Sequence, residues 1–171
     1  MTAVTAASGA IDGAALRSCL SRFATGVAVA AVDGPGGRAG LTVNSFTAVS
    51  LEPPLVLVSV LRSARCHDRF QGRPFTINVL GAEQERLAVH FAGRPQVEPV
   101  QWDESNGTPR LVSALAVIDC DPWATYDGGD HTLVVGRVTA FSCRQGDALG
   151  YVYSRFTPIA EPVLGVEYIF G

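Results

Sequence analysis

The chain has 171 residues, of which 47% are apolar and 17% are charged, and its formal net charge is −3. A chain of this length without a long linker predicts one domain over residues 1–171, able to bury roughly 70% of its unfolded surface. The small negative charge gives no electrostatic reason to expect a nucleic-acid partner. All thirteen basic residues are arginines, which excludes a Schiff-base lysine and the lysine of a phosphate-binding P-loop.

The low charge content also bears on assembly, since an average domain is about 25% charged. A surface so poor in charge predicts a homodimer that hides part of it, and a merely uncharged monomer surface is the alternative. No window reaches the roughly 18 apolar residues of a membrane span, and the N-terminus lacks the pattern of a signal peptide. We therefore expect a cytoplasmic protein with no membrane partner, a flexible tail over residues 1–12, and four reduced cysteines in the core.

Taken in chain order, hydrophobic periodicity predicts short helices over residues 14–23 and 83–91 and a loop over residues 95–109. Apolar runs of strand length, several of them bounded by glycine or proline turns, predict the strands: 27–32, 39–42, 55–60, 75–80, 111–126, 131–143 and 151–156. The Asp-Gly-Gly-Asp turn at 127–130 is a strong hairpin signal. Because hairpins dominate over strand–helix–strand units, the sequence predicts a mainly β fold, an antiparallel barrel with two or three short helices.

The segment 40–60 carries the first candidate site. Small polar side chains gather before a stiff Glu-Pro-Pro turn, and an apolar strand follows it: Thr42, Asn44, Ser45, Thr47 and Ser50. Hydroxyls beside backbone N–H groups bind a phosphate, and a flat apolar strand binds an aromatic ring, so the segment suggests a flavin nucleotide. The alternative is a hydroxyl-rich turn that caps its own backbone. Arg62, Arg65 and Arg69 either close over the same anion or form a solvated helix face.

His131 is the second candidate. It follows the glycine turn with Asp130 and is either catalytic or simply the tip of a hairpin. Gly93 ends the second predicted helix, where a C-cap glycine is an equally good explanation. We interpret His67 and His90 as half-buried helix residues.

Several motifs are absent. No Gly-x-Gly-x-x-Gly follows a strand, so a nicotinamide nucleotide would bind without a Rossmann site. No Gly-x-Ser-x-Gly elbow and no cysteine–histidine spacing typical of zinc occur, and no metal is expected.

The order of motifs nevertheless resembles the flavin reductase family of two-component monooxygenases. The match runs through Phe-Ala-Thr-Gly-Val at 23–27, Thr-Val-Asn-Ser-Phe-Thr-Ala-Val-Ser at 42–50 and Pro-Pro-Leu-Val-Leu-Val at 53–58. It continues through Phe-Thr-Ile-Asn-Val-Leu at 75–80, the helix with Gln84 and Phe91, and Gly-Asp-His-Thr at 129–132. The resemblance covers roughly residues 16–156 and rests on the order of these motifs, because each alone is weakly specific.

The resemblance implies an FMN-binding split β-barrel, a homodimer, and hydride transfer from NADH or NADPH to FMN or FAD. Reduced flavin would then diffuse to a separate monooxygenase. The sequence alone chooses neither between the two flavins nor between the two nicotinamide nucleotides. Two other readings stay open: a non-catalytic flavin- or haem-binding split-barrel protein, and an enzyme of the pyridoxamine phosphate oxidase type.

The resemblance also implies roles for particular residues. His131 would lie near the nicotinamide as the catalytic-site histidine. The flavin phosphate and ribityl chain would contact the residues Thr42, Val43, Asn44, Ser45 and Arg65. The isoalloxazine edge would lie along Val58, Ser59 and Val60, and the helix end would add Ala92, Gly93 and Arg94. Tyr153 or Arg155 would help to cover the nicotinamide.

Overall fold

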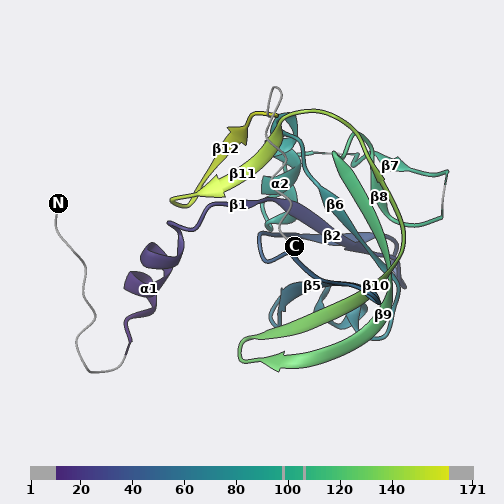
Figure 1. Ribbon diagram of the computed structural model, residues 1–171, viewed down its shortest axis with the longest axis horizontal. Coiled ribbons are helices and arrows are strands. Elements are labelled where there is room, and N and C mark those ends of the chain that lie inside the picture. The colour runs from purple at the N-terminus through teal and green to yellow at the C-terminus, as the bar shows by residue number, and fades with distance from the viewer. Residues whose placement is uncertain (1–10, 98, 106, 162–171) are drawn as a thin grey trace.

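Seven antiparallel strands form the main sheet of the protein (Figure 1). The computed structural model describes residues 11–97, 99–105 and 107–161. In spatial order the strands are β3 (Ala39–Val43), β2 (Ala28–Val32), β6 (Phe75–Val79), β9 (Ala116–Gly128), β10 (His131–Cys143), β5 (Pro54–Leu61) and β4 (Thr47–Leu51). The short loop at 44–46 joins the two edge strands, β3 and β4, and β3 also contacts β5. The sheet therefore curls back on itself, which confirms the predicted antiparallel split barrel.

Strand alternation fills two cores. On β5, Val56, Val58 and Val60 alternate with more exposed residues and point into the barrel. The strand β2 is buried on both faces, so Ala28, Ala30 and Val32 belong to the barrel core while its other face belongs to a second core under α2 (Glu85–Phe91). These two cores hold β3 and β5, the strands that carry the candidate site, in a fixed relation.

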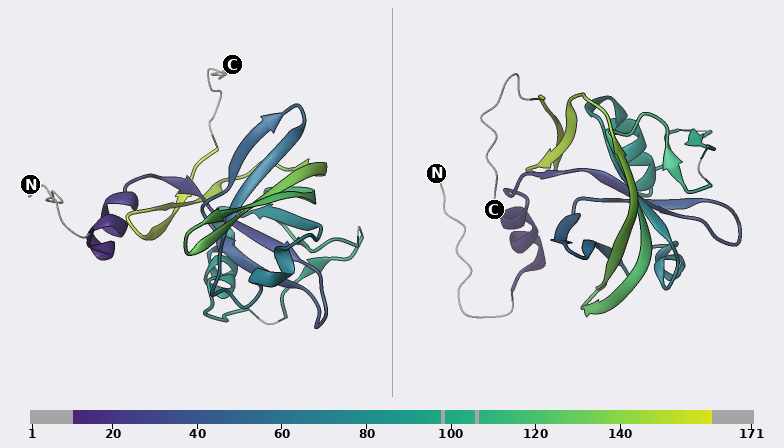
Figure 2. Two further views of the ribbon diagram at one scale, coloured as in Figure 1. Left: turned by 90° about the horizontal axis from the view of Figure 1, so that it is seen from below. Right: turned by 45° about the vertical axis from the view of Figure 1, so that its right-hand side comes forward.

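Smaller elements surround the barrel (Figure 2). They are the helix α1 (Gly13–Leu20), the sheet of β1 (Thr25–Gly26), β11 (Ala148–Val152) and β12 (Arg155–Ile159), the pair β7 (Trp102–Asp103) and β8 (Arg110–Leu111), and 3₁₀ turns at His67–Phe70 and Ala82–Gln84. The helix α1 extends away from the barrel and has no buried residue. None of the described helices is long and apolar enough to cross a membrane.

One predicted helix ends earlier in the structure than expected, and one predicted strand is a hairpin. The helix predicted at 14–23 stops at Leu20, with Ser21 as its C-cap. The strand predicted at 151–156 is instead a hairpin, because Tyr153 and Ser154 take left-handed φ values of 50° and 59°. A hydrogen bond of 2.6 Å from the Tyr153 N–H to the Ser21 carbonyl fixes this turn beside the end of α1.

Other differences concern strands. The strand predicted from residue 111 begins at Ala116, because Ser113 turns the chain with a φ of 64°. The strand β4 was not predicted, since its mostly exposed residues lack apolar alternation, and β7 lies inside the predicted loop at 95–109. The hairpin turn is confirmed and is tighter than predicted: β9 reaches residue 128, and Gly129 takes a φ of 74°.

The cysteines follow the prediction only in part. All four are free; Cys66 and Cys120 are buried, whereas Cys19 and Cys143 are exposed. Burial raises the pKa of Cys66, and burial beside two aspartates raises the pKa of Cys120 to about 12. Both buried thiols are therefore protonated at neutral pH and are poor nucleophiles.

Candidate functional site

A cavity of about 590 Å³ lies between β3, the segment that follows β5, and the C-terminal end of α2. We call it the β3–α2 cavity; its lining residues are 39–42, 61, 63–66, 69, 90–93 and 95. Four residues of the predicted flavin site meet here from three separate segments: Thr42, Arg65, Ala92 and Gly93. A volume in this range is typical of small-molecule sites.

Arg65 differs from the two neighbouring arginines. Arg62 pairs with Asp127 at 2.7 Å, and Arg69 donates to the Gly37 carbonyl at 2.9 Å. Within the described part of the chain Arg65 makes neither a hydrogen bond nor an ion pair, and it is exposed at the cavity. An unpaired guanidinium offers a fork of donors for a phosphate, so Arg65 is the side chain of this cavity best suited to bind an anion.

The helix end lines the cavity but uses its donors internally. The N–H groups of Ala92, Gly93 and Arg94 donate to carbonyls of α2 at 3.0–3.3 Å. Gly93 has a φ of 90°, as a residue just past a helix end commonly does, so the C-cap interpretation holds and the glycine also lines the cavity. Arg94 is exposed and is not among the lining residues. Contacts from this end would therefore be van der Waals contacts rather than N–H donation to a phosphate.

The hydroxyl of Thr42 is also engaged within the protein. Its Oγ1 donates to the Ala88 carbonyl in α2 at 2.6 Å. A hydroxyl has one proton, so this bond leaves Thr42 able to accept but not to donate. Thr42 therefore fixes α2 against β3 and so shapes the cavity between them.

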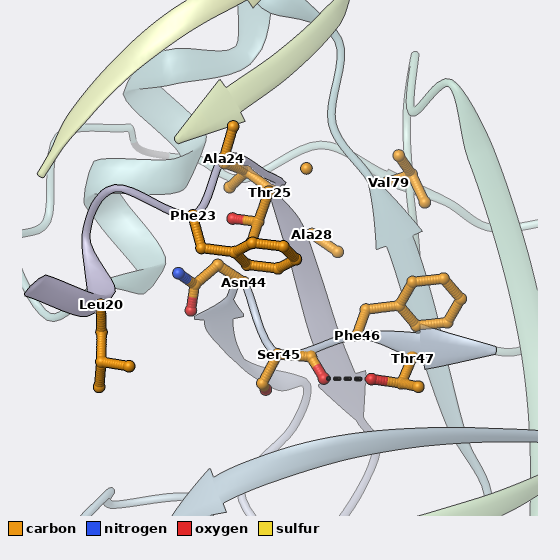
Figure 3. A pocket seen from close by; sticks show the side chains of 12 residues that line it. Leu20, Phe23, Ala24, Thr25, Ala28, Asn44, Ser45, Phe46, Thr47 and Val79 are labelled. Atoms are coloured by element: carbon orange, nitrogen blue, oxygen red, sulfur yellow. Dashed lines mark hydrogen bonds between the residues drawn. The ribbon is translucent and has the colours of Figure 1, made fainter. Parts of the chain in front are cut away.

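A second cavity, of about 560 Å³, adjoins the loop that links β3 to β4. We call it the β1–β4 cavity; residues 20, 23–28, 44–47 and 79 line it, and none of them is charged. Figure 3 shows Phe23, Thr25 and Asn44 at one end and Phe46 with Thr47 at the other. The Thr25 Oγ1 is buried and, among the described residues, has no hydrogen-bond partner.

The segment between the two cavities is held to β5. The Ser59 N–H donates to the Ser45 Oγ at 3.0 Å, which ties the loop after β3 to the middle of β5. The side chains of Val43, Val58 and Val60 lie in the barrel core, so only their backbone is left to contact a ligand. Asn44 is exposed at the β1–β4 cavity. Of these predicted residues, Asn44 and Ser45 line the β1–β4 cavity, and the valines lie behind them in the core.

His131 begins β10 directly opposite Leu61, which lines the β3–α2 cavity. Its Nδ1 lies 2.6 Å from the Asp130 carboxylate, and its side chain is partly exposed. The bond to Asp130 orients the ring and leaves Nε2 for another partner. His67 and His90 lie in short helical segments as expected, but only His90 is half-buried, and it accepts backbone N–H bonds. His67 is buried, and its Nε2 lies 2.9 Å from the Thr132 hydroxyl.

Within one chain, the structure does not bring Tyr153 and Arg155 to His131. They lie on the β11–β12 hairpin, beside α1, whereas His131 lies at the tip of the β9–β10 hairpin (Figures 1 and 2). The Arg22 guanidinium lies 5.5 Å from the centroid of the Tyr153 ring. Tyr153 or Arg155 could therefore cover a nicotinamide at His131 only if they came from a second chain.

The sequence analysis missed several lining residues. Leu61 and Ser63 line the β3–α2 cavity, and Phe23 and Thr25 line the β1–β4 cavity. The last two belong to the Phe-Ala-Thr-Gly-Val motif, which carried the resemblance but was given no role. No group of three or more potential metal ligands occurs among the described residues.

Comparisons with known proteins agree with this arrangement. The chain matches the family model of the flavin reductase like domain over residues 20–160. The NADH-dependent FAD reductase of Streptomyces globisporus is 40% identical over 163 residues, covering 88% of this chain and 89% of that protein. The reductase subunit HsaB of a flavin-dependent monooxygenase from Rhodococcus jostii is 37% identical over 158 residues, covering 90% of this chain and 80% of that protein.

A solved structure shows the same fold. It is the Streptomyces globisporus NADH:FAD oxidoreductase SgcE6 in complex with NAD and FAD fragments, with a TM-score of 0.81 and 37% identity. The match covers 89% of this chain and 95% of that one. Sequence and structure therefore favour the first of the three predicted readings over the binding-protein and pyridoxamine phosphate oxidase alternatives. The chain belongs to the flavin reductase family.

Proposed function

We propose that this protein is an NADH-dependent flavin reductase, which transfers a hydride from NADH to FMN or FAD and supplies reduced flavin to a partner monooxygenase. The family and the names of the relatives support the reaction. The monooxygenase partner is supported by a relative that is itself a reductase subunit of such an enzyme. NADPH as a second reductant and a cytoplasmic location are predictions from the sequence and its resemblance.

The observation that carries this proposal is the position of Arg65. Among the described residues it is an unpaired cation, at a cavity whose other walls are largely apolar side chains and backbone. Such a wall accepts a ligand with one anionic end and a flat, mostly uncharged remainder, as a flavin nucleotide has. The last carbonyls of α2 carry partial negative charge, so we place the phosphate at Arg65 and Ser63 rather than at the helix end.

The flat end of the flavin then lies toward the loop after β3, where Asn44 is exposed and the Ser45 Oγ accepts the Ser59 N–H. This direction leads to Leu61 and its cross-strand neighbour His131. The flavin and NADH supply the redox chemistry, and the chain's residues position the two rings. We assign His131 to orienting the nicotinamide amide through its free Nε2.

Moderate flavin affinity also follows from these contacts. One free guanidinium and a few neutral groups hold the flavin, which suits a substrate that must leave after reduction. We expect the purified protein to lose its yellow colour on dialysis. A flavin retained through dialysis would instead indicate a resident cofactor.

A homodimer completes the proposal. The helix α1 buries none of its residues, and Leu20 and Phe23 are 63% and 77% exposed beside the β1–β4 cavity. Apolar side chains gathered at one edge are typical of a protein interface. A second copy would cover them and could bring its Tyr153 or Arg155 to the nicotinamide.

The test of the function is a flavin-dependent NADH oxidase assay. Purified, dialysed protein is mixed with NADH, and the nicotinamide absorbance is followed with FMN, with FAD and without flavin. Oxidation that requires added flavin is the expected result, and NADPH is assayed in parallel. Oxidation that never exceeds the protein-free rate would contradict the proposal.

A further inference from the structure

Arg62 lies between the β3–α2 cavity and the turn that carries His131. It follows β5 directly, between Leu61 and Ser63, which both line the β3–α2 cavity. Its own groups turn the other way, toward the tip of the β9–β10 hairpin. The backbone N–H donates to the Asp130 carbonyl at 2.9 Å, and Nε donates to the Gly129 carbonyl at 2.9 Å. The Nη2 atom binds the Asp127 carboxylate at 2.7 Å.

These contacts fix the turn that presents His131. The Asp127 carboxylate also accepts the Gly129 N–H at 3.1 Å, so Arg62 and the turn share one acceptor. The next residue, Asp130, bonds to the His131 ring through its carboxylate. The position of the imidazole therefore depends on the peptide groups that Arg62 holds.

Stability does not account for this set of bonds. The Arg62 and Asp127 side chains are 45% and 83% exposed, and exposed ion pairs contribute little to folding. The hairpin also has a buried anchor that does not involve Arg62, the bond between His67 and the hydroxyl of Thr132, the residue after His131. Arg62 therefore determines the geometry of the tip rather than the formation of the hairpin. Its planar guanidinium donates in two directions at once, which a lysine ammonium does with less directional precision.

We propose that Arg62 is a positioning residue that holds the turn at 127–130, and with it His131, against the β3–α2 cavity. The inference rests on the proposed function, in which His131 orients the nicotinamide. Replacing Arg62 would leave the flavin phosphate contact at Arg65 intact. The expected effect of the replacement is therefore a higher KM for NADH.

The kinetic test compares Arg62→Ala with a matched control, Arg137→Ala. Arg137 forms an exposed ion pair with Asp121, at 3.6 Å, on the same two strands but away from the tip. We expect Arg62→Ala to raise the KM for NADH about three- to fivefold while the flavin Kd changes less than about twofold. Arg62→Lys should recover part of the loss, and Arg137→Ala should change neither constant.

A double-mutant cycle shows whether Arg62 acts through His131. In the His131→Ala background, adding Arg62→Ala should raise the KM for NADH by less than about 1.5-fold, because the positioned group is gone. Full additivity of the two changes would overturn the proposal. An unchanged KM in Arg62→Ala, or a flavin Kd that rises in parallel, would overturn it too.

A spectroscopic measurement separates this inference from the proposed function. The imidazole NMR signal of His131, assigned with His131→Ala, should shift or broaden in Arg62→Ala and stay unchanged in Arg137→Ala. This result is independent of turnover. Wild-type protein without flavin-dependent NADH oxidation would refute the function alone, and an unmoved His131 signal would refute the role of Arg62 alone.

Discussion

The two cavities lie on either side of the segment at 42–45 and differ in what they offer a ligand. The β3–α2 cavity contains Arg65, which has no partner in the part of the chain that the structure describes, and one wall is a helix end whose N–H groups are already used. The β1–β4 cavity has no charged lining residue and contains the buried hydroxyl of Thr25, which is likewise without a partner among those residues. The first is suited to an anion, and the second to an uncharged group.

This difference shows how a chain without lysine can recognise a flavin nucleotide. Two arginines line the β3–α2 cavity, and among the described residues only Arg65 lacks a protein partner, since Arg69 donates to the Gly37 carbonyl. Most of the remaining lining consists of apolar side chains and backbone. The largest effects on flavin binding should therefore come from Arg65, and smaller ones from the uncharged residues around the β1–β4 cavity.

Arg65→Ala should have the largest effect. A hydrogen bond to a charged group is worth about 1.5–3 kcal/mol, so the flavin Kd should rise about 10- to 150-fold. The melting temperature should stay unchanged, because Arg65 has no partner among the described residues. Flavin fluorescence titration and thermal unfolding give the two readings.

Arg94→Ala is the matched control for Arg65. Arg94 is also exposed and near the end of α2, but it does not line the cavity. We expect its replacement to leave the flavin Kd within about twofold of the wild-type value. Equal losses in the two variants would show that the phosphate lies nearer the helix end than we propose.

His131→Ala should have the next largest effect, on the other substrate. Loss of one hydrogen bond to the nicotinamide amide should raise the KM for NADH about three- to tenfold. Flavin affinity should be nearly unchanged, because His131 lies beside the β3–α2 cavity and does not line it. Steady-state kinetics with each substrate varied in turn would measure the KM values for NADH and for flavin separately. Normal KM values for both would refute this role.

Thr42→Val should act through structure. It removes the 2.6 Å bond from the Thr42 hydroxyl to the Ala88 carbonyl, which keeps a second donor in the Ala92 N–H. The free energy of unfolding should fall by about 1 kcal/mol, and the flavin Kd should rise less than in Arg65→Ala. Thr47→Val is the control, since its hydroxyl makes only an exposed 3.4 Å contact. A rise in the flavin Kd as large as that in Arg65→Ala would instead show that Thr42 contacts the phosphate directly.

The sequence predicts the barrel well because its strands are encoded locally. Alternation on β5 and the glycine turn between β9 and β10 specify a strand and a hairpin without long-range information. The strand β4 escaped prediction because its residues are mostly exposed and its pairing with β5 supplies the order. The left-handed Tyr153 and Ser154 depend on a contact with the end of α1, which no local pattern reveals.

The sequence predicted which residues gather at the site better than it predicted the contacts that each of them makes. Family motifs named Thr42, Arg65 and Gly93, and the structure places all three at one cavity. Which arginine lacks a partner among the described residues could not be read from the sequence, because the partners of Arg62 and Arg69 come from distant segments of the chain. Val58 and Val60 are buried because they lie on the face of β5 that points into the barrel core. The resemblance named these residues without regard to the face on which they lie.

Thr25→Val should have the smallest effect and the opposite sign to Thr42→Val. The Thr25 hydroxyl is buried without a partner in residues 11–97, 99–105 and 107–161, so replacing it with a methyl group of similar shape should raise the free energy of unfolding by about 1 kcal/mol or less. Denaturant unfolding at one fixed protein concentration, with an unchanged m-value, is the measurement. Thr25→Ser, which keeps the hydroxyl and loses the methyl group, should not stabilise. A loss of stability in Thr25→Val would mean that the hydroxyl gains a partner in the assembled protein, at the edge of the cavity that the proposed second chain covers.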